Sequence, residues 1–159
     1  MQARTQGDIQ RIYDQIEAVK KLSDRIIGIG PINIIGLDGI LAWFPGVDII
    51  YSVLAGLFLL IQGMRARCDL PTLVASFLVL AADSGISAFD GIIPVIPAGS
   101  LMDTFFQGQL YAAHMIQKNI EKTLYIEGSA SEAYRNGEHQ ANLQEMRSTK
   151  GKKRIVYLG

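Results

Sequence analysis

The chain has an apolar middle between two polar ends. From residue 26 to residue 117 the charged positions are few, and most of them are aspartates: Asp38, Asp48, Arg65, Arg67, Asp69, Asp83, Asp90 and Asp103. A soluble domain carries more surface charge than this. The pattern predicts an amphipathic helix in residues 1–25, an apolar membrane domain over residues 26–125, and a polar helix with a basic tail over residues 126–159.

In the N-terminal segment, apolar residues recur at helical spacing between charged and polar ones. Their positions are Ile9, Ile12, Ile16, Val19 and Ile26. This spacing predicts an amphipathic helix. Such a helix either packs its apolar side on the rest of the fold or lies in the membrane interface, and amphipathicity alone does not separate the two.

Two long apolar runs follow, over residues 47–64 and 70–102. As a helix, the first run would be about 27 Å long, which is just enough to cross the hydrocarbon core of a bilayer. Arg65 and Arg67 separate the runs, and Asp69 with Pro71 indicates a turn and a new helix start. We therefore expect a hairpin of two spans, with its turn on the side away from both termini.

The basic residues favour one orientation in the membrane. Five lie in residues 1–25 and eight in residues 102–159, against two in the turn. By the positive-inside rule, both termini should be cytoplasmic. The expected location is the inner (cytoplasmic) membrane of a bacterium.

An internal repeat relates residues 34–56 to residues 86–108 at an offset of 52 positions. The identical pairs are Ile34 and Ile86, Asp38 and Asp90, Gly39 and Gly91, Ile40 and Ile92, Pro45 and Pro97, and Gly56 and Gly108. Aspartate, glycine and proline are residues that interrupt helices. Each half is therefore predicted to be helix, break, helix, as in duplicated membrane folds.

The C-terminal third returns to a polar pattern. Helical spacing of apolar residues continues to residue 124, and Ser129 with Glu132 then matches a capping box that opens a polar helix ending near Arg147. A basic cluster follows, at Lys150, Lys152, Lys153 and Arg154. It forms either a solvated tail or a site for anionic lipid headgroups. The predicted fold is all-α: a small helical membrane protein with two helix-break-helix repeats and amphipathic helices at both ends.

Several short motifs of the apolar domain match those of one family. They are Gly36-Leu37-Asp38-Gly39-Ile40, Pro45-Gly46-Val47-Asp48, Asp83, Gly91-Ile92-Ile93-Pro94 and Asp103. Over about residues 20–125, the chain resembles the uncharacterised bacterial family called domain of unknown function 4112. The resemblance implies a small membrane protein with no assigned reaction.

Four aspartates in or beside the apolar segments form the candidate polar site: Asp38, Asp48, Asp83 and Asp90. An ionisable group inside a membrane is costly and by default suggests an ion or proton path. Asp48 follows a proline and a glycine, so it is also placed to cap the next helix. Asp83 and Asp90 are seven residues apart and share a face if their helix is unbroken.

Other chemistry finds little support in the sequence. The formal net charge is zero, which argues against a nucleic-acid partner. Cys68 is the only cysteine, and His114 and His139 are 25 residues apart without companion ligands. We therefore expect no metal, no cofactor and no enzymatic activity.

Two hypotheses of function remain. The first is a structural or accessory membrane protein that contacts lipids and associates with another membrane protein or a second copy through glycine-rich faces, such as those at Gly36, Gly39 and Gly56. The alternative is a small ion or proton transporter or channel that uses the intramembrane aspartates.

Overall fold

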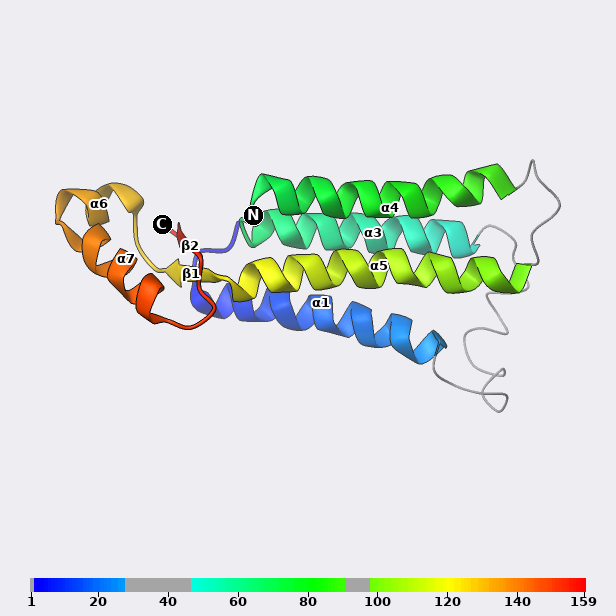
Figure 1. Ribbon diagram of the computed structural model, residues 1–159, viewed down its shortest axis with the longest axis horizontal. Helices are drawn as coiled ribbons and strands as arrows, with labels where there is room; N and C mark the ends of the chain where they lie inside the picture. The colour runs from blue at the N-terminus through cyan, green and yellow to red at the C-terminus, as the bar shows by residue number, and fades with distance from the viewer. Residues whose placement is uncertain (1, 28–46, 91–97) are drawn as a thin grey trace.

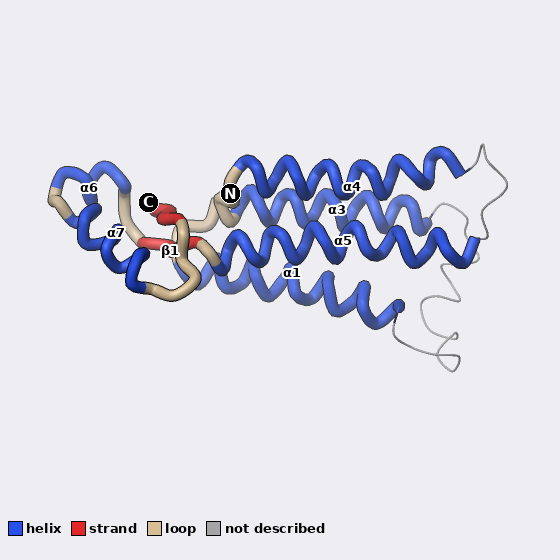
Figure 2. Tube along the Cα trace, in the orientation of Figure 1, coloured by secondary structure: helices blue, strands red, loops and turns tan. Residues whose placement is uncertain are grey.

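Four long helices run side by side, and a small unit of two strands and two short helices lies at one end of them (Figure 1). Figure 2 shows the same arrangement by secondary structure. The structure is a computed structural model. It describes the backbone of residues 2–27, 47–90 and 98–159, and the side chains of residues 2–21, 53–82 and 108–159.

The bundle consists of α1 (Gln6–Ile27), α3 (Val47–Arg65), α4 (Leu70–Asp90) and α5 (Ala98–Glu121). The C-terminal unit consists of β1 (Thr123–Ile126), α6 (Ala130–Arg135), α7 (Glu138–Ser148) and β2 (Arg154–Tyr157). Helix α5 packs against the other three long helices. Helices α1 and α4 lie on opposite sides of it, and successive long helices run in opposite directions (Figure 1).

The predicted N-terminal helix is α1, and its apolar side packs on the bundle. Ile9, Ile12 and Ile16 are buried in the core that α1 shares with α3 and α5. A capping box starts the helix: Thr5 Oγ1 accepts from the Asp8 N–H at 3.1 Å, and the Asp8 carboxylate accepts from the Thr5 N–H at 3.2 Å. Packing on the fold is thus confirmed for this face of the helix.

The predicted helical hairpin is confirmed as α3 and α4. Asp69 caps α4, because its Oδ1 accepts a hydrogen bond from the Thr72 N–H at 2.9 Å. The side on which the turn lies was predicted wrongly. The Arg65 carbonyl accepts from the Ala3 N–H at 3.1 Å, and the Arg67 guanidinium donates to the carbonyl of Leu158, also at 3.1 Å.

The turn therefore lies beside both ends of the chain. The physical reason is that α1 and α5 run alongside the hairpin as full helices of the bundle (Figure 1). Each long helix reverses the direction of the one before it. With four helices in place of two, the chain returns to the same end after α3 and again after α5.

Glycine lets α3 approach its neighbours closely. A Cβ added to Gly63 would lie 2.8 Å from Leu73 Cδ2 on α4 and 3.3 Å from Ile116 Cδ1 on α5. A Cβ added to Gly56 would lie 3.3 Å from Leu80 Cδ2 on α4. Small residues at helix interfaces allow this close approach. Gly56 therefore packs within its own chain, and the prediction that it faces a partner helix was wrong.

The C-terminal region contains a sheet that the all-α prediction missed. Strands β1 and β2 pair in parallel, with Thr123 opposite Arg154 and Ile126 opposite Tyr157. Each strand has four residues, and the paired positions are 31 apart in the sequence. So short a run carries no clear periodicity, and its pairing partner is decided by tertiary packing. Helix α5 accordingly ends at Glu121, not at residue 124.

The predicted polar helix is present as two helices. Ser129 caps α6, as predicted, with its Oγ accepting from the Glu132 N–H at 3.5 Å. Gly137 then adopts a φ of 77° between α6 and α7. This left-handed backbone conformation favours glycine and separates the two helices.

Two further predictions concern segments that the structure describes only in part. Among the side chains in the three described ranges, no helix presents a window long and apolar enough to cross a membrane. The repeat over residues 34–56 and 86–108 falls largely outside the described residues, as do Gly36 and Gly39.

The close packing at Gly63 gives a first prediction. Gly63→Ala should lower the free energy of unfolding by about 0.5 to 2 kcal/mol, because overpacking against Leu73 costs about 1 to 3 kcal/mol and the helix propensity of alanine offsets up to about 1 kcal/mol of it. Thermal unfolding of the purified protein measures the change. In a Leu73→Ala background the same substitution should cost much less, since the crowded atoms are gone.

Gly7→Ala is the matched control, because the nearest atom to its added Cβ is Thr5 Oγ1 at 3.7 Å. Alanine also has the higher helix propensity, so this variant should be neutral or slightly more stable. Equal stability of the Gly63→Ala variant and the wild type would contradict the close packing.

Candidate functional site

The four predicted aspartates are placed only in part. Asp48 lies near the start of α3, and Asp83 and Asp90 lie on α4, which is continuous between them as the same-face prediction requires. The side chains of these three residues, and Asp38 as a whole, lie outside the described residues. The use of these aspartates as a polar site remains a prediction.

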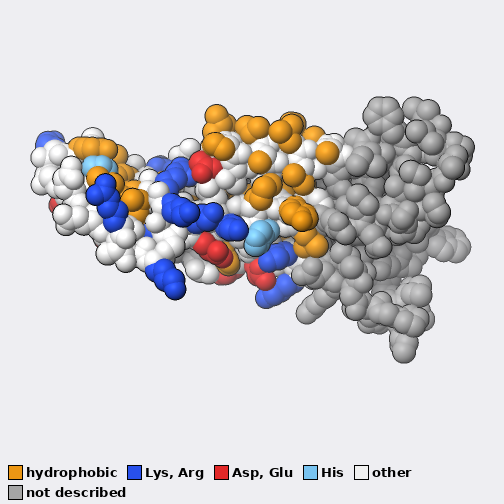
Figure 3. All heavy atoms as spheres, viewed as in Figure 1, with side chains coloured by type: hydrophobic (Ala, Val, Ile, Leu, Met, Phe, Trp, Pro, Cys, Tyr) orange, Lys and Arg blue, Asp and Glu red, His pale blue; other side chains and the backbone are white. Residues whose placement is uncertain are grey.

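Helices α3 and α4 expose an unusual number of large hydrophobic side chains. The apolar face comprises Val53, Leu54, Leu57, Ile61 and Met64 of α3, and Leu70, Val74, Phe77 and Leu78 of α4. Leu54 and Leu78 are each 60% exposed. Figure 3 shows hydrophobic side chains gathered over this part of the bundle. Exposed apolar patches of this kind are uncommon on proteins that are surrounded by water alone.

The opposite side of the bundle is charged. Helix α1 carries five charged residues that together form the charged flank: Arg11, Asp14, Glu17, Lys20 and Lys21. Arg11, Asp14 and Lys21 are exposed, whereas Glu17 and Lys20 are half-buried and also bond to Gln117 of α5. Glu17 pairs with Lys20 at 3.7 Å and with Lys21 at 4.0 Å. Because α1 and α4 lie on opposite sides of α5, the bundle has one apolar side and one charged side.

A groove of about 650 Å³ lies at the polar end of the bundle, where α4 begins, α5 ends and β2 passes. Its polar lining residues are Asp69, Thr72, Lys118, Asn119, Lys122, Thr123, Lys153 and Arg154. We call this the basic groove. Four cationic side chains and one carboxylate line it. Figure 3 shows basic side chains close to the hydrophobic ones in this region.

A hydrogen-bonded network fixes the floor of the basic groove. Asn119 Nδ2 donates to Asp69 Oδ2 at 2.8 Å and to Thr72 Oγ1 at 3.0 Å. Arg154 donates to Asn119 Oδ1 at 3.4 Å. Burial opposes ionisation of Asp69, but the hydrogen bonds from Thr72 and Asn119 and the nearby Arg154 guanidinium outweigh it and lower its pKa. Asp69 is therefore engaged as an ionised carboxylate that orders the groove.

The four residues of the basic cluster predicted at the C-terminus lie in different surroundings in the structure. Lys150 is exposed in the turn before β2, whereas Lys152 Nζ donates to the carbonyls of Glu121 at 2.9 Å and Thr123 at 2.8 Å. Of the four predicted residues, Lys153 and Arg154 line the basic groove. The segment is thus part of the fold rather than a free tail.

Sequence reasoning missed Lys118 and Lys122, which complete the cationic lining. They are four residues apart near the end of α5, a spacing that places them on one face of a helix. This spacing is the signal that could have found them. Their proximity to β2 is a tertiary fact that the sequence does not display.

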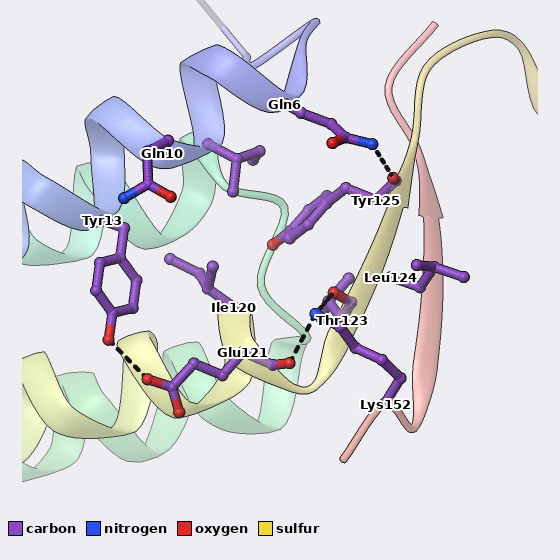
Figure 4. Close-up of a pocket in the computed structure, with 10 residues that line it drawn as sticks. Gln6, Gln10, Tyr13, Ile120, Glu121, Thr123, Leu124, Tyr125 and Lys152 are labelled. Atoms are coloured by element: carbon purple, nitrogen blue, oxygen red, sulfur yellow. Dashed lines mark hydrogen bonds between the residues drawn. The ribbon is translucent and has the colours of Figure 1, made fainter. Parts of the chain in front are cut away.

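A second cavity of about 380 Å³ lies between α1, the end of α5 and β1 (Figure 4). Its polar groups bond to one another. The Tyr13 hydroxyl donates to Glu121 Oε1 at 2.6 Å, which together with burial raises the pKa of Tyr13 to about 12. Gln6 Nε2 donates to the carbonyl of Tyr125 at 3.0 Å. These contacts join α1 to the end of α5 and to β1, and they are structural.

Comparison with known proteins identifies the family to which the chain belongs. The sequence profile described as Domain of unknown function (DUF4112) matches residues 12–120, well over half of the chain. The chain belongs to this family. No curated protein and no solved structure gives a significant match. The matched segment of this DUF4112 protein runs from α1 to the end of α5, so β1, α6, α7 and β2 lie beyond it.

Cys68 of this DUF4112 protein is a buried, free thiol. Burial, with Asp69 nearby, outweighs the effect of Arg154 and raises the pKa of Cys68 to about 12. The reactive thiolate is therefore scarce at neutral pH. Among the described residues, no group of three or more histidine, cysteine, aspartate or glutamate side chains is placed to hold a metal ion.

The Asp69 network gives a second prediction. Asp69→Ala should lower the free energy of unfolding by about 0.5 to 2 kcal/mol at neutral pH, because it removes the cap of α4. The pKa of Asp69 is lower in the folded than in the unfolded protein, so its stabilisation is complete above the ordinary aspartate pKa. It should disappear as the pH falls through the lowered pKa.

Unfolding of wild type and variant across acidic pH measures this difference. Asp14→Ala is the control, since Asp14 is exposed in the middle of α1 and caps no helix. A difference between wild type and Asp69→Ala that does not change with pH would contradict the role of the ionised carboxylate.

Proposed function

We propose that this protein is a structural or accessory membrane protein whose apolar face contacts lipid acyl chains. The apolar face on α3 and α4 is the observation that carries the proposal. Burying one leucine or phenylalanine side chain stabilises by about 1.5 to 3 kcal/mol relative to leaving it in water. The nine residues of the face therefore favour an apolar environment strongly.

The position of the charges supports a lipid environment on one side only. No charged residue lies between Val53 and Met64 on α3 or between Leu70 and Ala82 on α4. The charged flank on α1 would be costly to place among acyl chains. The bundle is thus suited to lie with α3 and α4 in the membrane and with the outer surface of α1 away from the acyl chains.

The contacts near the two chain ends support a location of both termini on the same side of the membrane. The turn at Arg65 and Arg67 hydrogen-bonds to residues near each end of the chain. Two further basic residues thereby join the polar end of the bundle. By the positive-inside rule this end faces the cytoplasm, and we propose the inner membrane of a bacterium as the location.

A third prediction follows for membrane attachment. The protein should stay with the membrane after carbonate and high-salt washes, because the attachment is apolar and is not screened by salt. Leu57→Asp combined with Leu78→Asp should release it into the wash, since each places a charge at an exposed position of the apolar face. Immunoblots of the pellet and the supernatant measure the distribution.

Ala18→Asp is the matched control, because Ala18 is exposed on α1, away from the apolar face. This variant should be retained like the wild type. Release of the wild type by carbonate would overturn the proposal and indicate that the face is covered by a protein partner or a second copy.

A fourth prediction concerns orientation. Cysteines introduced by Gln2→Cys, Arg65→Cys and Arg147→Cys should all react with an impermeant thiol reagent from the same side of the membrane, since the turn lies beside both chain ends. Buried Cys68 should contribute little background. Labelling of Arg65→Cys from the side opposite to the other two would contradict the arrangement.

A further inference from the structure

The basic groove opens onto an apolar seam between α4 and α5. On α4, Pro71, Ala75 and Leu78 follow each other at helical spacing from the groove to the apolar face. On α5, Met115 lines the groove, and Tyr111, one turn away, is 64% exposed. Cationic groups therefore adjoin a strip of mostly apolar side chains, which the exposed His114 interrupts on α5. The strip is about 10 Å long, judged by helical rise from residue 118 to residue 111.

Three of the four cations of the groove are free to bind an anion. Within the described part of the chain, the side chains of Lys118, Lys122 and Lys153 form no ion pair and no hydrogen bond. Asp69, the carboxylate of the groove, already accepts bonds from Thr72 and Asn119. The four cations thus leave a formal excess of three positive charges at the groove.

We propose that the groove binds the phosphate of one anionic phospholipid, with an acyl chain lying along the seam between α4 and α5. This inference rests on the proposed membrane location and adds a specific ligand site to it. Lys118, Lys122 and Lys153 contact the phosphate, while Arg154 and Asn119 are positioning residues. The apolar seam favours a phospholipid over a free phosphate, because only the lipid has a chain to cover it.

The test uses the detergent-solubilised full chain and three probes: short-chain phosphatidylglycerol, short-chain phosphatidylcholine and glycerol phosphate. Calorimetric titration should show the tightest binding for phosphatidylglycerol, which joins a net negative headgroup to apolar chains. Lys118→Gln and Lys153→Gln should each weaken it about fivefold, the effect of one basic residue near a lipid headgroup. Both lysines are exposed, so the fold should be unaffected.

Two further variants separate the parts of the site. Leu78→Ser should weaken phosphatidylglycerol binding and leave glycerol phosphate unchanged, because it removes apolar surface from the seam and alters no cation of the groove. Lys150→Gln, outside the groove, should bind like the wild type. Equal binding of phosphatidylcholine and phosphatidylglycerol would overturn the site, as would equal binding of phosphatidylglycerol and glycerol phosphate, which would show a site for free phosphate.

A carbonate wash of membranes that contain each lysine variant tests membrane retention separately from lipid binding. It therefore distinguishes failure of this inference from failure of the proposed function. The lysine variants should be retained like the wild type, since the apolar face is intact. Absence of selective phosphatidylglycerol binding in a wild-type protein that stays with the membrane would overturn the groove alone. Release of the wild type from the membrane would overturn the proposed function.

Discussion

The guanidinium of Arg67 joins the parts of the molecule on which the groove depends. It donates to the main-chain carbonyls of Tyr157 and Leu158, while the Arg67 carbonyl accepts from Arg154 at 2.8 Å. A hydrogen bond to a charged group contributes about 1.5 to 3 kcal/mol. The turn between α3 and α4 is thereby tied to β2, and pairing with β1 ties β2 to the end of α5. One polar end results from three distant segments.

The polar end makes one end of the bundle chemically different from the rest of it. Its long helices bury a narrow core in which Gly63 and Ala112 allow close approach, and in which Gln62 and Gln117 are buried and hydrogen-bonded to α1. Polar contacts therefore add to the apolar packing that holds α1 to the bundle. Nine large hydrophobic residues of α3 and α4 are left on the outside, while Leu59 and Leu80 lie in the core. The bundle thus has an apolar outer face as well as an apolar core, and this exposed face is the basis of the proposed membrane contact.

Local patterns of the sequence predicted much of this arrangement. The buried face of α1 followed from the spacing of Ile9, Ile12 and Ile16, and the start of α4 followed from Asp69. Periodicity and capping depend on neighbours within one turn, so the sequence displays them directly. Lys118 and Lys122 were visible as a pair on one helical face, although nothing near them in the sequence indicated a groove.

Taken alone, the sequence determined the helical hairpin, the amphipathic first helix, the apolar middle and the family. Only the tertiary structure decided the pairing of β1 with β2, the return of the turn to the chain ends, and the meeting of Lys118 with Lys153. These contacts join segments far apart in the chain. Their geometry depends on the number of helices in the bundle and on how closely these helices pack. Neither property can be predicted from a local pattern of residues.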